Sequence, residues 1–295
     1  MSWIFKNVIP NIGTITEGPC WNGKELLFSN ISHNRVLSYN PSNNKVYEFI
    51  SDTGGANGLN YNKEQELFAC EGSRRNISKY NIDGSKEIIA ESLDGKKLNA
   101  PNDLAINSKG SIYFSDRVED INPEMGIGFS AIISADKNSD GTYTTNRRTF
   151  DTSMPNGLLF NEEQNILYVA QSDYRADRER ELRSYSVESD GSLSNMKVLH
   201  DFGPHRGIDG MTLASSNSNE NYIVAATGWE LSGPGGSIVV FDQDGKIVER
   251  HLAPCERPTN CTFINNKIYV TSIEGHLLEA ETELSGILLW PENKS

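Results

Sequence analysis

Six short apolar runs recur along the 295-residue chain at similar intervals. The runs are rich in β-branched and aromatic residues and are too short for helices, so they indicate strands. Taking one residue of each run as an anchor gives Phe28, Phe68, Phe114, Val169, Val224 and Val270. The steps between successive anchors are 40, 46, 55, 55 and 46 residues. Repeats of about 40–50 residues are typical of propellers and solenoids.

Hairpin turns separate these strands. Asn-Gly and Asp-Gly pairs favour tight two-residue hairpins, and they occur at Asn22-Gly23, Asp83-Gly84, Asp94-Gly95, Asp140-Gly141, Asp190-Gly191 and Asp244-Gly245. Each unit therefore predicts four antiparallel strands, which make one propeller blade. We expect an all-β, six-bladed β-propeller, with residues 1–295 forming a single domain around a central channel. The last unit, residues 258–290, is one strand short, and residues 3–8 could supply it and close the ring.

Charge and composition narrow the class of partner. The formal net charge is −13 and no basic block occurs, so nucleic acid and anionic membranes are poor partners. No apolar stretch approaches the roughly 20 residues of a membrane span, and the N-terminal residues do not resemble a signal peptide. The four cysteines form no CxxC pair, which argues against a zinc knuckle or a redox dithiol. We expect a soluble, cytoplasmic protein with a small-molecule substrate, and leave open whether it is a monomer or a weak dimer.

An oxygen-bearing side chain opens the innermost strand of each predicted blade. These residues precede their anchors by about 10–15 positions and are Glu17, Asn57, Asn102, Asn156, Asp209 and either Asn260 or Thr259. Innermost strands line the central channel of a propeller. The six side chains should therefore converge at one end of the channel. Each residue alone is an ordinary turn residue, but their shared register favours a common site.

The chemistry of this ring points to a cation. Two carboxylates about 5 Å apart repel by roughly 3 kcal/mol at an effective dielectric of 20, and a hard divalent ion removes that cost. An all-oxygen set suits Ca²⁺, Mg²⁺ or Mn²⁺ better than Zn²⁺. Water would complete the coordination shell, and such a metal can polarise a carbonyl group and activate water.

The opening turns also carry a family resemblance. Thr16-Glu17-Gly18-Pro19, Pro101-Asn102-Asp103, Pro155-Asn156-Gly157-Leu158, Asp209-Gly210-Met211 and Arg257-Pro258-Thr259-Asn260 together resemble the senescence marker protein, gluconolactonase and luciferin-regenerating enzyme family. The resemblance covers nearly the whole chain. It implies a six-bladed propeller with one divalent cation in the channel, Ca²⁺ first and Mg²⁺, Mn²⁺ or Zn²⁺ as alternatives. It also implies hydrolysis of sugar lactones, with organophosphate hydrolysis in relatives.

The resemblance assigns roles to individual residues. Glu17, Asn156 and Asp209 match the family's metal ligands, and Asn102 matches an amide that binds substrate or completes the metal shell. Asp209 also matches the family's proposed catalytic acid or base. The chain departs from the animal gluconolactone-hydrolysing members at Ala100, where they carry an arginine. That departure puts their substrate in doubt for this chain without affecting the metal ligands.

The loops at the same end of the channel should carry recognition, because long loops on a rigid scaffold often do so. Our candidates for substrate contact are Asn102, Asp103, Arg117 and Trp229. Asp209 would take a proton from water or attack the lactone carbonyl directly. Two alternatives stay open: a phosphotriester hydrolase that uses the same ion, and a propeller that binds a ligand without catalysis.

Overall fold

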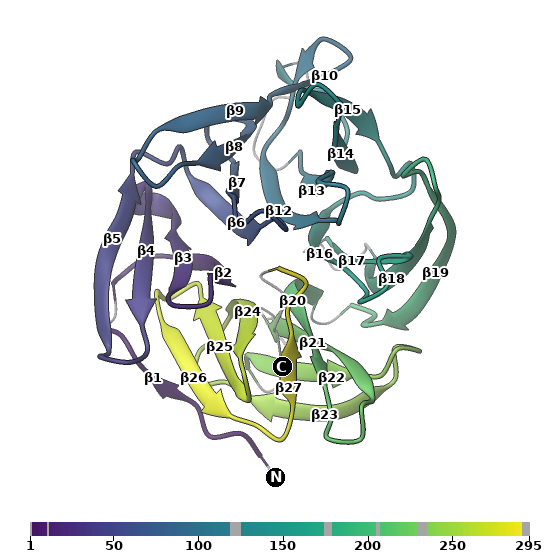
Figure 1. Cartoon of the computed structure of the whole chain (residues 1–295). Coiled ribbons are helices and arrows are strands. Elements are labelled where there is room, and N and C mark those ends of the chain that lie inside the picture. Colours follow the sequence, from purple (N-terminus) through teal and green to yellow (C-terminus); the bar gives the residue numbers. More distant parts are fainter. Residues whose placement is uncertain are drawn as a thin grey trace.

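The computed structural model describes residues 2–10, 12–118, 125–173, 179–204, 207–228 and 235–290. Six small antiparallel sheets stand around a common centre, and successive sheets follow the chain around the ring (Figure 1). The six-bladed β-propeller expected from the repeat is therefore confirmed. None of the described residues forms a helix of the length and apolarity that a membrane span requires.

The first three blades each contain four sequential strands. Blade 1 consists of β2 (Thr16–Trp21), β3 (Leu26–Asn30), β4 (Arg35–Asn40) and β5 (Lys45–Ser51), with a short 3₁₀ turn, η1 (Ile31–His33), between β3 and β4. Blade 2 consists of β6 (Ala56–Tyr61), β7 (Leu67–Glu71), β8 (Asn76–Tyr80) and β9 (Lys86–Ala90). Blade 3 consists of β12 (Pro101–Ile106), β13 (Ile112–Asp116), β14 (Ala131–Lys137) and β15 (Tyr143–Arg147). A small hairpin, β10 (Ser92–Leu93) and β11 (Lys96–Lys97), connects blades 2 and 3 and turns at Asp94-Gly95.

The last three blades follow the same plan, with strands added at the two chain ends. Blade 4 consists of β16 (Pro155–Phe160), β17 (Ile166–Ser172), β18 (Arg180–Val187) and β19 (Leu193–Asp201). Blade 5 consists of β20 (Gly207–Ser215), β21 (Asn221–Gly228), β22 (Ser237–Phe241) and β23 (Ile247–Leu252). Blade 6 consists of β24 (Pro258–Ile264), β25 (Lys267–Ser272), β26 (Leu277–Glu281) and the N-terminal β1 (Lys6–Asn7). A further strand, β27 (Ser285–Ile287), pairs with β20.

The apolar anchors lie in the second strand of every blade. These strands are hydrogen-bonded on both edges and covered on both faces by neighbouring blades, so that β3, β7 and β13 are buried along their whole length. Burial on both faces explains why the anchors appear as continuous apolar runs. The outermost strands face solvent on one side, as the largely exposed β5 shows.

The ring closes through the N-terminal segment, as predicted. Lys6 pairs with Glu279 of β26 and its Nζ lies 2.9 Å from Oε1 of that residue. Tyr39 of blade 1 and Tyr269 of blade 6 pack in one apolar cluster across the closing interface. Blades 1 and 6 therefore pack against each other, and neither leaves this face exposed.

The C-terminal segment differs from the prediction, which assigned residues 258–290 to the last blade. Instead β27 pairs with the inner edge of blade 5 and lies near the centre of the ring (Figure 1). The chain then crosses the channel, where the Trp290 indole donates a 3.0 Å hydrogen bond from Nε1 to the Ile106 carbonyl of blade 3. The prediction was wrong for residues 285–290. Because β1 is the fourth strand of blade 6, β27 pairs with β20 instead, and the apolar residues after it lie in the channel.

Candidate active site

A β-bulge interrupts each of the six innermost strands close to its start. On β6, for example, Ala56 pairs with Glu71 and Leu59 pairs with Ala69, so three steps on β6 face two steps on β7. The other five innermost strands shift register at the corresponding place. Bulges redirect side chains out of the regular ladder. The opening turn can therefore present polar groups to the channel while the rest of the strand stays apolar.

The bulges show how the six polar residues of the opening turns correspond. Asn57, Asn102, Asn156 and Asp209 all lie two residues before the first paired residue that follows the bulge. Glu17 lies one residue earlier than this position, and Asn260 lies one residue later. The shared register predicted from the sequence is thus accurate to within one residue. The structure also decides between the two alternatives on β24: the Thr259 hydroxyl donates to the Thr16 carbonyl and lies 2.9 Å from Thr271 Oγ1, and Asn260 faces the carboxylates.

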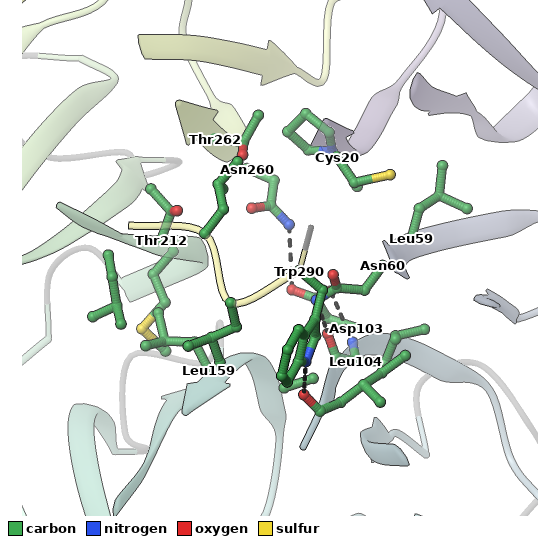
Figure 2. Close-up of a pocket in the computed structure, with 18 of the residues that line it drawn as sticks. Cys20, Leu59, Asn60, Asp103, Leu104, Leu159, Thr212, Asn260, Thr262 and Trp290 are labelled. Carbon is green, nitrogen blue, oxygen red and sulfur yellow. Dashed lines mark hydrogen bonds between the residues drawn. The ribbon is translucent and has the colours of Figure 1, made fainter. Parts of the chain in front are cut away.

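One half of the cluster joins Glu17 to Asp103 through Asn260. The Glu17 carboxylate is 6% exposed and accepts hydrogen bonds from the Gly18 amide and from Asn260 Nδ2, the latter at 3.1 Å. The same Nδ2 lies 3.2 Å from Asp103 Oδ2, and Asp103 Oδ1 accepts from the Leu104 amide at 2.8 Å. Figure 2 shows the Asn260 side chain pointing across the pocket toward Asp103.

The other half of the cluster is built on Asp209. Asn156 is 1% exposed and donates from Nδ2 to Asp209 Oδ1 at 2.7 Å. The Arg257 guanidinium lies 3.7 Å from Asp209 Oδ2 and brings a positive charge to the edge of the cluster. Arg257 was not among the predicted site residues, although its place directly before the opening turn Pro258-Thr259-Asn260 was a usable signal.

The carboxylates are close enough to affect one another's protonation. Burial raises the pKa of Glu17 well above its usual value, and the negative charges of Asp209 and Asp103 raise it further. Burial also raises the pKa of Asp103 to about 7, with a smaller contribution from Asp209. Removal from water and like charges both disfavour the ionised form of a carboxyl group. The site therefore concentrates more negative charge than its protein surroundings offset.

Glycines make the close approach of the six strands possible. A Cβ on Gly58 would lie 2.4 Å from Asp103 Oδ1, and a Cβ on Gly210 would lie 2.0 Å from Asn260 Cγ. No side chain can be accommodated at such distances. The glycines after Asn57 and Asp209 thus leave room for a polar side chain of another blade, which gives these Asn-Gly and Asp-Gly pairs a structural reason beyond turn formation.

The donor set fits a hard divalent cation. Burial and neighbouring negative charges raise the pKa values of Glu17 and Asp103, and carboxylate and amide oxygens are the ligands that Ca²⁺ and Mg²⁺ prefer. In the part of the chain that the structure describes, no three His, Cys, Asp or Glu side chains form a metal site by themselves. Amide oxygens would therefore have to contribute. Asn156 is suited to this role because it uses its nitrogen to bind Asp209, which directs its carbonyl oxygen elsewhere.

Some of the predicted site residues lie in the cluster, and others lie beside it or outside the described residues. Glu17, Asp103, Asn156 and Asp209 form the cluster, and the half-buried Asn102 precedes Asp103 on β12. Arg117 is 3% exposed and donates from Nε to Met154 Sδ at 3.4 Å, beside the opening turn that carries Asn156. Trp229 lies outside the described residues. Substrate contact by Asn102, Asp103, Arg117 and Trp229 stays a prediction.

A small cavity lies behind the cluster, in the channel. Its volume is about 110 Å³, and Asp103 and Asn260 line it together with Leu289 and Trp290 of the C-terminal segment (Figure 2). Trp290 is 8% exposed and packs in an apolar cluster with residues of blades 1 and 2. The channel thus has a polar end and an apolar end. The apolar pair Leu288-Leu289 before Trp290 was the sequence signal for this burial.

These observations define the class: a closed six-bladed propeller whose channel carries a buried acid-and-amide cluster suited to one hard cation. The chain belongs to the family described as the SMP-30/Gluconolactonase/LRE-like region, whose model matches residues 15–274. The family resemblance seen in the opening turns is therefore confirmed.

Individual relatives are distant in sequence but similar over most of their length. The chain is 24% identical over 275 residues to a gluconolactonase of Zymomonas mobilis, covering 84% of this chain and 72% of that protein. The structure of a gluconolactonase from Xanthomonas campestris superposes with a TM-score of 0.78 at 24% identity, covering 95% of this chain and 89% of that one. Regucalcin of Agrobacterium tumefaciens, described as a calcium-binding protein, gives a TM-score of 0.75 at 16% identity, with 96% and 95% coverage. These structural likenesses show a shared fold.

Proposed function

We propose that the protein is a metal-dependent lactonase that opens the ring of a sugar lactone. The observation that carries the proposal is the cluster of Glu17, Asn156 and Asp209 at one end of the channel, where burial and the charges of Asp209 and Asp103 raise the pKa of Glu17. Membership of the family and the gluconolactonase relative from Zymomonas mobilis support a lactone-hydrolysing enzyme.

Glu17, Asn156 and Asp209 would hold the cation, with Asn102 as a further ligand or as a substrate contact. When bound, a divalent ion at this place would polarise the lactone carbonyl and offset the negative charge that develops during attack. Ca²⁺ is the first candidate because the ligands are all oxygen, and because the neighbour from Agrobacterium tumefaciens is described as calcium-binding. Mg²⁺, Mn²⁺ and Zn²⁺ are alternatives.

Asp209 is the proposed catalytic residue. In one route its carboxylate accepts a proton from water while the water oxygen bonds to the carbonyl carbon, and the proton then passes to the ring oxygen as the carbon–oxygen bond breaks. In the other route the carboxylate itself attacks the carbonyl carbon and forms an acyl anhydride with Asp209. The ring carbon–oxygen bond breaks, the ring oxygen takes a proton from water, and a second water then hydrolyses the anhydride and regenerates the carboxylate. Asn156 holds Oδ1 through its 2.7 Å hydrogen bond in either case. The positive charge of Arg257 near Oδ2 offsets part of the negative charge of the cluster.

Substrate orientation is proposed for Asn102, Asp103, Arg117 and Trp229. Ala100 occupies the place of an arginine in the animal gluconolactone-hydrolysing members, and its amide donates to the buried Asp116 carboxylate at 2.8 Å. An alanine leaves no guanidinium for sugar hydroxyl groups at this point. We therefore expect a lactone with fewer or differently placed hydroxyl groups than gluconolactone to be a good substrate.

A substrate panel tests the proposal. Purified protein is analysed for bound metal, stripped with EDTA, and assayed with sugar lactones, aliphatic lactones and organophosphate triesters after addition of Ca²⁺, Mn²⁺ or Zn²⁺. Lactone hydrolysis that EDTA abolishes and a divalent ion restores is the expected result. Metal-dependent turnover of the triesters alone would favour a phosphotriesterase. Absence of turnover with every ion would favour a ligand-binding propeller.

A further inference from the structure

We propose that Asn260 is a positioning residue, whose side-chain amide bridges Glu17 and Asp103 and so holds Glu17 in place as a metal ligand. The part of this inference that concerns the metal rests on the proposed function. Asn260 is not itself one of the proposed ligands. Its role follows from three features of the structure: the orientation of its amide, the packing around it, and the place of its two partners in the ring.

The orientation of the amide is set by the backbone. Asn260 Oδ1 accepts a 2.8 Å hydrogen bond from the Cys261 amide, which directs the Nδ2 group toward the channel. That group is then placed to donate to Glu17 Oε2 at 3.1 Å and to Asp103 Oδ2 at 3.2 Å. A carboxamide nitrogen is a hydrogen-bond donor. Asn260 therefore supplies N–H groups to the cluster, whereas the sequence pattern had suggested an oxygen ligand from every blade.

Packing leaves little free space around the amide. Asn260 is 7% exposed, and Gly210 of β20 is the residue against which it lies, at a distance that leaves no room for a Cβ on that glycine. The side chain is thus confined between β20 and its two carboxylate partners. A confined donor can fix the position of its acceptors.

The two acceptors come from different parts of the ring. Glu17 lies on β2 of blade 1, next to blade 6, and Asp103 lies on β12 of blade 3. Asn260 of blade 6 reaches Asp103 across the pocket (Figure 2). Without this amide the two carboxylates would face each other with less to offset their repulsion. Groups that orient metal ligands typically change metal affinity by about 10–100-fold when they are removed.

The first experiment measures Ca²⁺ affinity by titration calorimetry on EDTA-stripped protein. Asn260→Leu keeps the approximate volume and removes the donor, so we expect the Kd for Ca²⁺ to rise by about 10–100-fold. The matched control is Thr259→Val, a buried polar residue on the same strand that bonds to the Thr16 carbonyl and to Thr271 and to no carboxylate. The control should lower Tm and leave Kd within about twofold of wild type. Unchanged affinity in the Asn260→Leu variant would overturn the inference.

The second experiment needs no metal. In EDTA at pH 8, Asn260→Asp places a third carboxylate between Glu17 and Asp103, so Tm should fall by roughly 5 °C or more because like charges in contact are destabilising. Adding Asp103→Asn to this variant restores an amide–carboxylate contact and should recover at least half of the loss. Asp103→Asn alone completes the cycle. A double variant no more stable than Asn260→Asp alone would show that Asn260 does not couple these carboxylates.

The two experiments separate this inference from the proposed function. If wild-type protein binds none of Ca²⁺, Mn²⁺ or Zn²⁺, the cation part of the proposed function is wrong, and the stability cycle alone then decides whether Asn260 bridges the two carboxylates. If wild type binds Ca²⁺ and the Asn260→Leu variant binds it equally well, the proposed function stands and the inference fails.

Discussion

The two ends of the channel are built from the same six strands and are held together in opposite ways. At the end where the innermost strands start, the carboxyl groups of Glu17, Asp103 and Asp209 lie near one another, and burial and the neighbouring charges raise the pKa values of Glu17 and Asp103. At the other end, β27 and Trp290 fill the channel with apolar side chains and one indole hydrogen bond. One end is thus electrostatically unfavourable without a cation or bound protons. The other end is stabilised by packing. We therefore expect substitutions at the polar end to affect catalysis and substitutions at the apolar end to affect stability.

The sharpest test of this contrast is Asp209→Asn. We expect turnover to fall by about 10²–10⁴-fold, because the variant lacks the carboxylate that would accept a proton or attack the carbonyl. Tm should stay close to that of wild type, since an amide keeps the shape of the side chain next to Asn156. Lactone assays and thermal unfolding followed by circular dichroism measure both quantities. Near-normal turnover in a folded variant would remove Asp209 from the mechanism.

The corresponding change at the apolar end is Trp290→Ala. Large-to-small changes at buried aromatic residues cost about 3–5 kcal/mol, and Trp290 is 8% exposed. Tm should fall by roughly 5 °C or more, while Ca²⁺ affinity stays within about threefold of wild type. Calorimetry and thermal unfolding on one sample measure both. A large loss of affinity with little loss of Tm would reverse the division between the two ends.

The stability of the metal-free protein should depend on pH, with a smaller effect on Tm than that of Trp290→Ala. The pKa of Asp103 is raised to about 7 in the folded state, compared with about 3.9 in an unfolded chain. Between these values the folded protein binds more protons than the unfolded chain, so stability falls as pH rises from about 4 to about 7. Glu17 acts in the same direction.

Tm measured in EDTA should accordingly be higher at pH 5 than at pH 8 by a few degrees. Saturating Ca²⁺ should reduce this difference, because the cation replaces the protons as the partner of the carboxylates. A metal-free protein that is more stable at pH 8 would contradict the electrostatic description of the polar end.

The smallest expected effect concerns charge at the apolar end. Lys63 Nζ lies 5.9 Å from the centre of the Trp290 ring, and cation–π contacts at exposed sites contribute only about 0.5–1 kcal/mol. Lys63→Ala should lower Tm by about 2 °C or less. A loss comparable to that of Trp290→Ala would mean that the C-terminal segment is held by charge rather than by packing.

The number of blades, the buried second strands and the opening turns that carry Glu17, Asn156 and Asp209 could all be predicted from the amino-acid sequence. These features are predictable because burial on both faces leaves a continuous apolar run, and because a tight bulge with close neighbours requires glycine or a small polar residue. These are local requirements, and they repeat with the blade.

The contacts between side chains of different blades became visible in the three-dimensional structure alone. Asn260 contacts Glu17 and Asp103 at separations of 243 and 157 residues, and Arg257 reaches Asp209 across a blade boundary. The periodicity of the sequence does not indicate whether the nitrogen or the oxygen of an amide side chain faces a distant carboxylate. The same holds for the tail: the apolar character of residues 288–290 indicates burial, but the channel became their site only because β1 had completed the last blade.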